Sequence, residues 1–250
     1  MASRHNPGAA STLLTALFDG DPLRLEEATR TRVSVHYETG DASVPVLSVC
    51  TPDAVRLPCS LVTPVLPCPG PASVGAGELA VGTASWRVAR WWLPPRLVGL
   101  GRPSRCVATP PSAGSPRLQG VPLPCPSYDG LSPGILVGKG PGLTPAGDDV
   151  LAGALVTAHA VDDPRLPRWR RATCSALASR TTTAVSRGLL HHALDGYATP
   201  ELAALVTGLC EGRDVTVETD ALLAVGHTSG AALLAGVLHV LSTHELEGAA

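Results

Sequence analysis

Aromatic residues are scarce in this chain of 250 residues, since Phe, Trp and Tyr together make up only 3% of it. Charged residues are also few, at 16%, whereas hydrophobic residues reach 44%. A chain with this balance is folded rather than disordered. Its core must consist mainly of Ala, Val and Leu, and such a core favours closely packed helices.

An excess of charge and a long apolar run are both missing. The formal net charge is only −2, so the sequence indicates neither a nucleic-acid partner nor an acidic membrane surface. The amino end has no continuous apolar stretch typical of a secretory signal. Residues 221–241 are apolar but are interrupted by GHTSG, which predicts two buried helix segments rather than a membrane span. We therefore expect a cytoplasmic protein.

Cysteines occur without any C-x-x-C pair, although the chain contains seven of them. Cys50, Cys59 and Cys68 are equally spaced, but no histidine lies close by to complete a zinc site. Free thiols in a reducing compartment are the expected state.

The amino-terminal half has the pattern of short strands. RVSVHYE alternates from Arg32, VPVLSVC ends at Cys50, and residues 78–92 suggest one or two more strands. Residues 11–18 predict a short helix before them, with Ser11 or Thr12 as its cap. These features predict a β-rich domain, either a sandwich or a barrel.

Residues 101–133 are rich in proline, which removes backbone donors and excludes both helix and central strand. This segment is either a linker or a loop draped over a site. Beyond it the pattern is helical. We predict an α+β protein with a β-rich domain at residues 1–130 and a bundle of about five helices at residues 131–250.

The first distinctive motif is GKGPGLTPAGDD at residues 138–149, followed by an apolar helix. Glycines let backbone N–H groups approach a ligand closely, and the start of a helix suits an anion. Asp148 and Asp149 could cap that helix, or hold Mg²⁺ against a bound anion. The motif is not a P-loop, because Gly140 follows Lys139 where Ser or Thr would be needed.

Two further motifs lie closer to the carboxyl end. In TTTAVSRGLLHHALDG, Thr182 and Ser186 share a helix face and could supply hydroxyls, while Arg187 could supply a guanidinium. In GHTSG, the serine is one place late for a nucleophile elbow, so Ser229 is expected to cap the last helix. His227 could bind an anion or transfer a proton, or be a core histidine.

These three motifs resemble the AllH-type family, whose best-studied branch is a subunit of bacterial oxamate carbamoyltransferase. GxGPGLTPAGDDxLAG at 138–153, TTxxSRxLLxHAxxG at 182–196 and GHTSGxxxLAG at 226–236 carry the resemblance, which extends over roughly residues 70–245. The resemblance implies purine (allantoin) nitrogen catabolism. It also implies transfer of a carbamoyl group from oxalurate to phosphate, together with partner subunits.

The working hypothesis is a carbamoyltransferase subunit that binds a small anionic carbonyl substrate between residues 138–149 and 226–230. Asp148, Asp149 and His227 are the candidate catalytic residues, with the two aspartates as a possible Mg²⁺ site. The candidate binding residues are Gly140, Gly142, Leu143, Thr144, Gly147, Thr182, Ser186, Arg187, Thr228, Ser229 and Gly230. The alternatives are a non-catalytic subunit active only in a complex, and a phosphotransferase or other transferase with a changed substrate. An oligomer is compatible with each.

Overall fold

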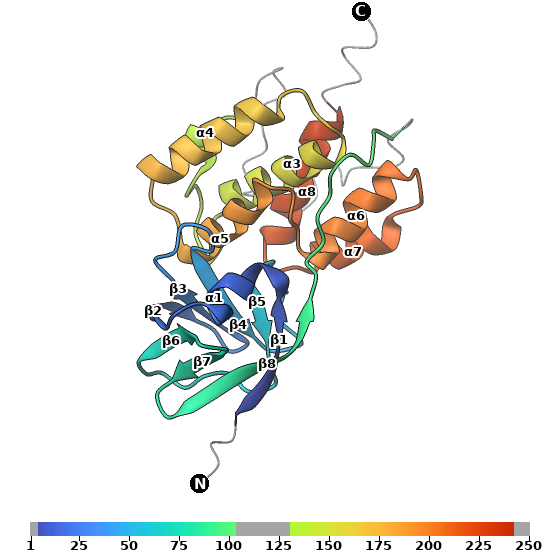
Figure 1. Cartoon of the computed structure of the whole chain (residues 1–250). Helices are drawn as coiled ribbons and strands as arrows, with labels where there is room; N and C mark the ends of the chain where they lie inside the picture. Colours follow the sequence, from blue (N-terminus) through green and yellow to red (C-terminus); the bar gives the residue numbers. More distant parts are fainter. Residues whose placement is uncertain (1–4, 104–130, 243–250) are drawn as a thin grey trace, which may run out of the picture. The chain divides into compact units, whose positions relative to one another are not determined.

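The computed structural model describes residues 5–103 and 131–242. It divides into two compact units between Pro94 and Pro95. The fold is α+β, with strands in the first unit and helices dominating the second (Figure 1). The domain boundary expected near residue 130 falls on residues 104–130, which lie outside the described residues.

The first unit is a closed barrel of eight strands in the order β1-β5-β4-β3-β2-β6-β7-β8. A 3₁₀ turn (Thr12–Leu14) and the short helix α1 (Thr15–Asp19) follow the first strand. The strands are β1 (Asn6–Ser11), β2 (Leu23–Arg30), β3 (Ser34–Glu38), β4 (Val46–Cys50), β5 (Ser60–Val62), β6 (Ala72–Gly75), β7 (Glu78–Val81) and β8 (Ala84–Trp92).

The first and last strands close the barrel by pairing with one another. β1 runs parallel to β8, with Asn6 opposite Trp86 and Ser11 opposite Trp92. β4 and β5 are also parallel, and the other neighbouring strands are antiparallel. Closure leaves no free sheet edge.

Strands β3 to β5 are buried on both faces. Val35, Val49 and Leu61 are opposite one another on an apolar face and are fully buried. The other face carries His36, whose Nε2 lies 2.9 Å from Ser34 Oγ and whose Nδ1 lies 2.8 Å from Ser48 Oγ. Burial lowers the pKa of His36 to about 4, so the ring is neutral at neutral pH.

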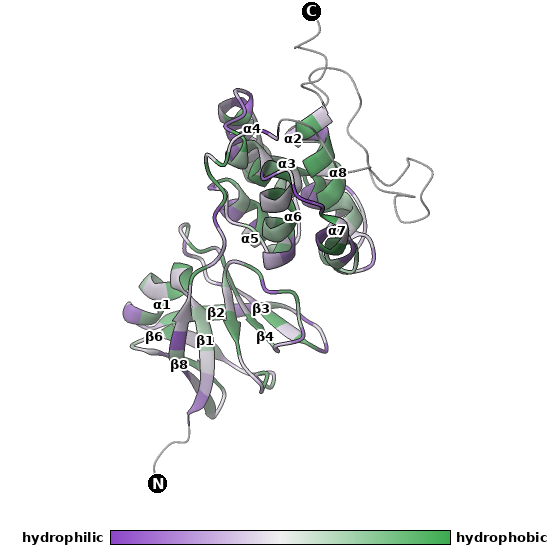
Figure 2. Cartoon of the chain, turned by 90° about the vertical axis from the view of Figure 1, so that its right-hand side faces the viewer, coloured by the Kyte–Doolittle hydropathy of each residue, from purple (hydrophilic) through white to green (hydrophobic). Residues whose placement is uncertain are grey.

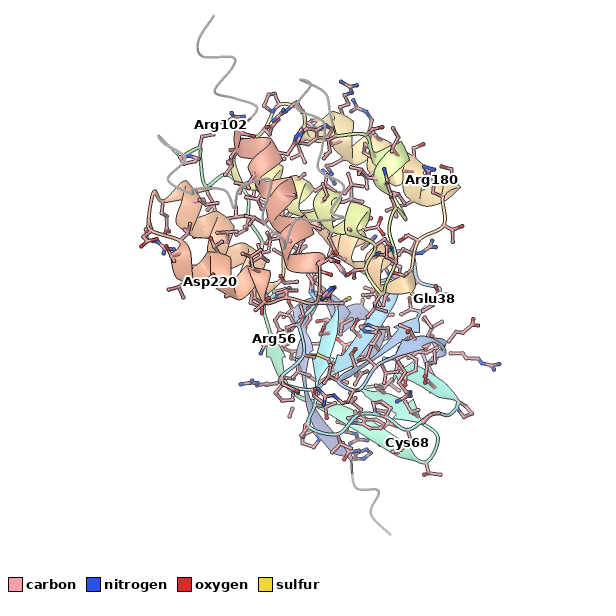
Figure 3. The ribbon with its side chains drawn as sticks, turned by 180° about the vertical axis from the view of Figure 1, so that it is seen from behind. Glu38, Arg56, Cys68, Arg102, Arg180 and Asp220 are labelled. Atoms are coloured by element: carbon pink, nitrogen blue, oxygen red, sulfur yellow. The ribbon has the colours of Figure 1, made fainter. Side chains whose placement is uncertain are left out.

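The predicted β-rich half is confirmed as a barrel, and Ser11 caps the turn as expected by accepting from the Leu13 N–H. Strands β1, β2, β5 and β6 were not predicted from the sequence. β1 contains proline and two alanines, and β2 contains adjacent glutamates, so neither has an apolar alternation that predicts a strand. The five described cysteines are free thiols, and Cys68 is exposed (Figure 3).

The second unit is helical. Its helices are α2 (Pro133–Leu136), α3 (Ala146–Ala160), α4 (Leu166–Ser179), α5 (Ala184–Ala193), α6 (Pro200–Cys210), α7 (Thr216–Leu223) and α8 (Ser229–Ser242). Thr182 lies between α4 and α5, so the expectation that it shares a helix face with Ser186 is wrong, whereas the predicted interruption at GHTSG separates α7 from α8. Among the described residues, no helix combines the length and hydropathy needed to cross a membrane.

Helix α3 is the centre of this unit. Every one of its residues is buried, and it packs against α2, α4, α5, α6 and most extensively α8. Figure 2 colours most of α8 as hydrophobic. The two helices approach closely because a Cβ at Gly153 would clash with the Leu233 carbonyl oxygen, and one at Gly236 with the Val150 carbonyl oxygen. This contact holds the first turns of α3 and α8 in place.

Candidate functional site

The loop at residues 137–145, between α2 and α3, is exposed at its tip and anchored at its ends. Gly138, Gly140 and Gly142 all have positive φ, a conformation that side chains disfavour. The described residues provide no acceptor for the N–H groups of Gly140, Gly142, Leu143 and Thr144. These donors are therefore open to solvent or to a ligand.

Helix α3 begins directly after this loop, and its aspartates do not cap it. The N-cap position is Pro145, which offers no side-chain hydrogen bond. The expectation of a capping aspartate is therefore wrong, because Asp148 and Asp149 lie inside the first turn and are buried. Their negative charge still suits this end of the helix.

Asp148 is fully engaged within the protein. Its Oδ1 accepts from the N–H of Gly138 at 2.9 Å, and its Oδ2 accepts from the hydroxyl of Thr182 at 2.5 Å. The carboxylate thus ties the loop at 137–145 to the segment that precedes α5. Its role is to position the loop.

Asp149 has a different environment. Its side chain is buried, with 1% exposure, and Oδ2 has no hydrogen-bond partner among the described residues. Burial raises the pKa of Asp149 to about 7, and the negative charge of Asp148 adds to this effect. The hydroxyls of Ser229 and Thr144 act in the opposite direction by hydrogen bonding. Asp149 is therefore divided between its protonated and ionised forms near neutral pH.

The two glycine-bearing loops meet beside Asp149. Thr144 Oγ1 and Ser229 Oγ lie 2.7 Å apart, although 85 residues separate them in the sequence. Ser229 is the first residue of α8, and its hydroxyl contacts Thr144. No His, Lys or Arg side chain contacts it among the described residues, and the nearest carboxyl group is that of Asp149, to which the Ser229 hydroxyl hydrogen-bonds.

The rest of the second loop is less involved. The N–H of Gly230 donates to the carbonyl of Val225 and is therefore not an open donor, while a role of Gly230 in binding stays a prediction. His227 is exposed, which excludes the core-histidine interpretation. Thr228 is half-buried, and its carbonyl accepts from the N–H of Ala232. None of the contacts found among the described residues joins His227 to either aspartate.

The start of α5 supplies further polar groups. Thr183 caps the helix by accepting from the Ser186 N–H, and it donates to the carbonyl of Leu143 at 2.6 Å. Thr183 was not among the residues predicted for the site, although its place three residues before Ser186 is the spacing of a capping residue. At the end of α4, Arg180 donates to the Gly134 carbonyl and ties α4 to α2 (Figure 3).

Ser186 and Arg187 hold unused hydrogen-bonding groups. Ser186 is fully buried, and its Oγ has no partner among the described residues. Arg187 is half-buried, and its Nε is likewise without a partner there. A buried polar atom without a partner costs free energy, so these atoms are candidates for contact with a ligand.

The donor set does not fit a magnesium ion well. No group of three or more His, Cys, Asp or Glu side chains in the described part of the chain is arranged to hold a metal. Both Asp148 oxygens are already occupied, which leaves Asp149 as a single carboxylate ligand. The described residues therefore do not support the expected Mg²⁺ site, so neither aspartate is assigned as a metal ligand and no chemical step involves a metal.

Comparison with known protein families addresses the second unit. Residues 136–241 match the family model described as oxamate carbamoyltransferase subunit AllH. The helical unit is AllH-like. This confirms the family resemblance, and the AllH match contains every candidate site residue predicted from the sequence.

The AllH match leaves the barrel outside its limits. It begins at residue 136, so the resemblance that the sequence motifs suggested for residues 70–135 has no counterpart in it. No solved structure was found to match the chain. The AllH similarity therefore concerns the unit that carries the two loops and the buried aspartates.

Proposed function

We propose that this chain is a subunit or homologue of oxamate carbamoyltransferase that binds a small anionic carbonyl substrate in its AllH-like unit. Two observations support this proposal. The first is the AllH match over residues 136–241. The second, which carries most weight, is the buried and unpartnered carboxylate oxygen of Asp149 beside the Thr144–Ser229 contact.

The proposed roles follow from the donors and acceptors that the protein leaves unused. The open N–H groups of Gly140, Gly142 and Thr144 would bind carbonyl or phosphoryl oxygens on which charge develops during carbamoyl transfer. Ser186 and Arg187 would bind the carboxylate end of the substrate, since guanidinium groups pair well with carboxylates. Asp148, Thr182 and Thr183 would hold the loop in position.

The substrate class is a small molecule that carries both a carboxylate or phosphate and a carbamoyl group. Oxamate, oxalurate and carbamoyl phosphate have this composition. In this proposal the chain works in purine (allantoin) nitrogen breakdown together with other subunits. His227 stays a candidate for proton transfer at the rim of the site.

Calorimetric titration of the full-length protein with oxamate and with carbamoyl phosphate tests this proposal. Ser186→Ala should weaken binding by about tenfold, because it removes a hydrogen bond to the ligand. The melting temperature should change little, since the Ser186 hydroxyl has no partner in the described structure.

A matched control is available in the same unit. Thr173 on α4 is also fully buried, and its Oγ also has no partner among the described residues. Thr173→Val should therefore leave binding unchanged. If neither ligand binds, and the protein instead co-purifies with other transferase subunits, the scaffolding hypothesis replaces this one.

A further inference from the structure

The two adjacent aspartates of α3 differ in how their oxygens are satisfied. Asp148 accepts one N–H and one hydroxyl, whereas Asp149 Oδ2 accepts nothing from the described residues. An ionised carboxyl has about four acceptor positions. Each Asp148 oxygen has a donor, so Asp149 Oδ2 is the oxygen of this pair that still lacks one among the described residues.

The hydroxyls beside Asp149 cannot fill that capacity. Thr144 and Ser229 carry one hydroxyl hydrogen each, and one of the two hydrogens lies in the contact between them. At most one remains to donate to Asp149. The described residues offer no second donor, so a ligand N–H or protonation of the carboxyl itself would satisfy this oxygen.

The charges around Asp149 decide which kind of ligand group would fit. The groups that influence its pKa are the Asp148 carboxylate on α3, the Thr144 hydroxyl on the loop and the Ser229 hydroxyl on α8. None of them is a cation. A ligand carboxylate facing Oδ2 would be repelled by Asp148 and by ionised Asp149, whereas a neutral N–H would not.

We propose that Asp149 is a specificity-determining residue of the site, whose Oδ2 accepts an N–H from a carbamoyl or primary amide group of the ligand. This inference rests on the proposed function and adds the group that the site selects. A molecule with a methyl group or a carboxylate in place of the amide would leave Oδ2 without a donor. The site would therefore discriminate among ligands that share the same carboxylate end.

Binding of an amide at Asp149 is coupled to protonation of the Asp149 carboxyl group. A donor to the carboxylate favours its charged form, so the amide competes with protonation of Asp149. Because the pKa of Asp149 in the free protein is about 7, amide binding below this pH favours release of a proton, since the ionised carboxylate accepts an N–H more strongly than the neutral acid does. Affinity for the amide should fall as the pH is lowered through 7 and level off above it.

Calorimetry on the full-length protein with oxamate and pyruvate provides the test. These two ligands share a carboxylate with an adjacent carbonyl, and they differ only in the group on that carbonyl, which is an amino group in oxamate and a methyl group in pyruvate. We expect oxamate to bind at least about tenfold more tightly at about pH 8. Its affinity should fall by up to about tenfold per pH unit below the pKa of Asp149, while that of pyruvate should not.

Two variants distinguish the contribution of Asp149 to binding from that of Ser186. Asp149→Asn should remove the pH dependence of oxamate binding, because an amide side chain does not titrate. Ser186→Ala should weaken both ligands alike, because it acts at their shared carboxylate. Proton release measured in buffers of different ionisation enthalpy should approach about one proton per oxamate near pH 6 and vanish in Asp149→Asn.

The outcomes distinguish the two proposals. If neither ligand binds the wild-type protein, the proposed function fails, and this inference fails with it. If both bind with similar affinity and without pH dependence, the site stands and the role of Asp149 is overturned. The wild-type measurements alone decide this, even if Asp149→Asn does not fold.

Discussion

Two buried polar clusters, one in each unit, have opposite hydrogen-bonding states. In the barrel, both ring nitrogens of His36 are bonded, one to Ser34 and the other to Ser48. In the helical unit, Asp149 is equally buried, but one of its oxygens has no partner among the described residues. Burial shifts the pKa of each group toward its neutral form, lowering that of His36 to about 4 and raising that of Asp149 to about 7.

In our proposal, this difference separates a structural polar group from one that binds a ligand. A neutral histidine with both nitrogens bonded loses little by being buried. A carboxyl group with a free oxygen keeps an unsatisfied acceptor at a cost of roughly 1–3 kcal/mol. The helical unit therefore carries a local instability that a suitable ligand would relieve.

Among the variants that test this comparison, Asp149→Asn should have the largest effect on stability. Between pH 3.8 and about 7 the folded protein binds one more proton at Asp149 than the unfolded chain, so wild-type stability falls as the pH rises through this range. At about pH 8 the variant should avoid a penalty of roughly 4 kcal/mol, since each pKa unit corresponds to about 1.4 kcal/mol. Thermal unfolding of both proteins at several pH values measures this difference.

Asp148→Asn is the matched control one residue away. An amide nitrogen cannot accept a hydrogen bond, so this variant loses one of the two bonds that Asp148 receives from Gly138 and Thr182. It should be less stable than the wild type at neutral and alkaline pH. If both asparagine variants shift stability in the same direction, the contrast between the two aspartates is wrong.

His36 in the barrel should show the opposite pH dependence. Its pKa is about 4 in the folded protein against 6.5 for an ordinary histidine, so the unfolded chain binds more protons between these values. Stability should decrease by about 3 kcal/mol as the pH falls from 7 to about 4. His36→Gln should lack this part of the acid dependence in denaturant unfolding, whatever its stability at neutral pH.

The smallest effect on stability is expected from removing the hydrogen bond between Thr182 and Asp148. Thr182→Val removes the hydroxyl that donates to Asp148 Oδ2 and leaves a second unpaired carboxylate oxygen next to Asp149. We expect a loss of about 1–3 kcal/mol in the free energy of unfolding. Thr182→Ser keeps the donor and should stay close to the wild type, and an equal loss in both variants would contradict the role given to the hydroxyl.

Much of the helical unit could be predicted from local sequence signals. Thr199 and Pro200 mark the start of α6, and the hydroxyl of Thr199 accepts from the Leu202 N–H as a capping residue does. The run of threonines at 181–183 marks the break before α5. The mainly apolar sequence of α3 after Asp149 predicts a helix buried on all sides, and all residues of α3 are buried. Each of these signals acts within a few residues.

The features that the sequence did not predict depend on distant contacts. When the barrel closes, Asn6 lies opposite Trp86 in the paired strands. The composition of β1 does not indicate a partner strand so far along the chain. The state of each aspartate is also set from a distance, because Asp148 is paired by Thr182 and Asp149 is not. Neighbouring residues of identical chemistry can be told apart only once the fold has placed their surroundings.

The parallel pairing of β1 with β8 affects how the barrel is made during synthesis. The edge of β1 that faces β8 stays uncovered until the ribosome has released residues 84–92, which are the last strand of the unit. An uncovered strand edge can pair with another nascent chain. Pairing between strands so far apart in the sequence is slow. The barrel should therefore be most prone to aggregation just before β8 emerges from the ribosome.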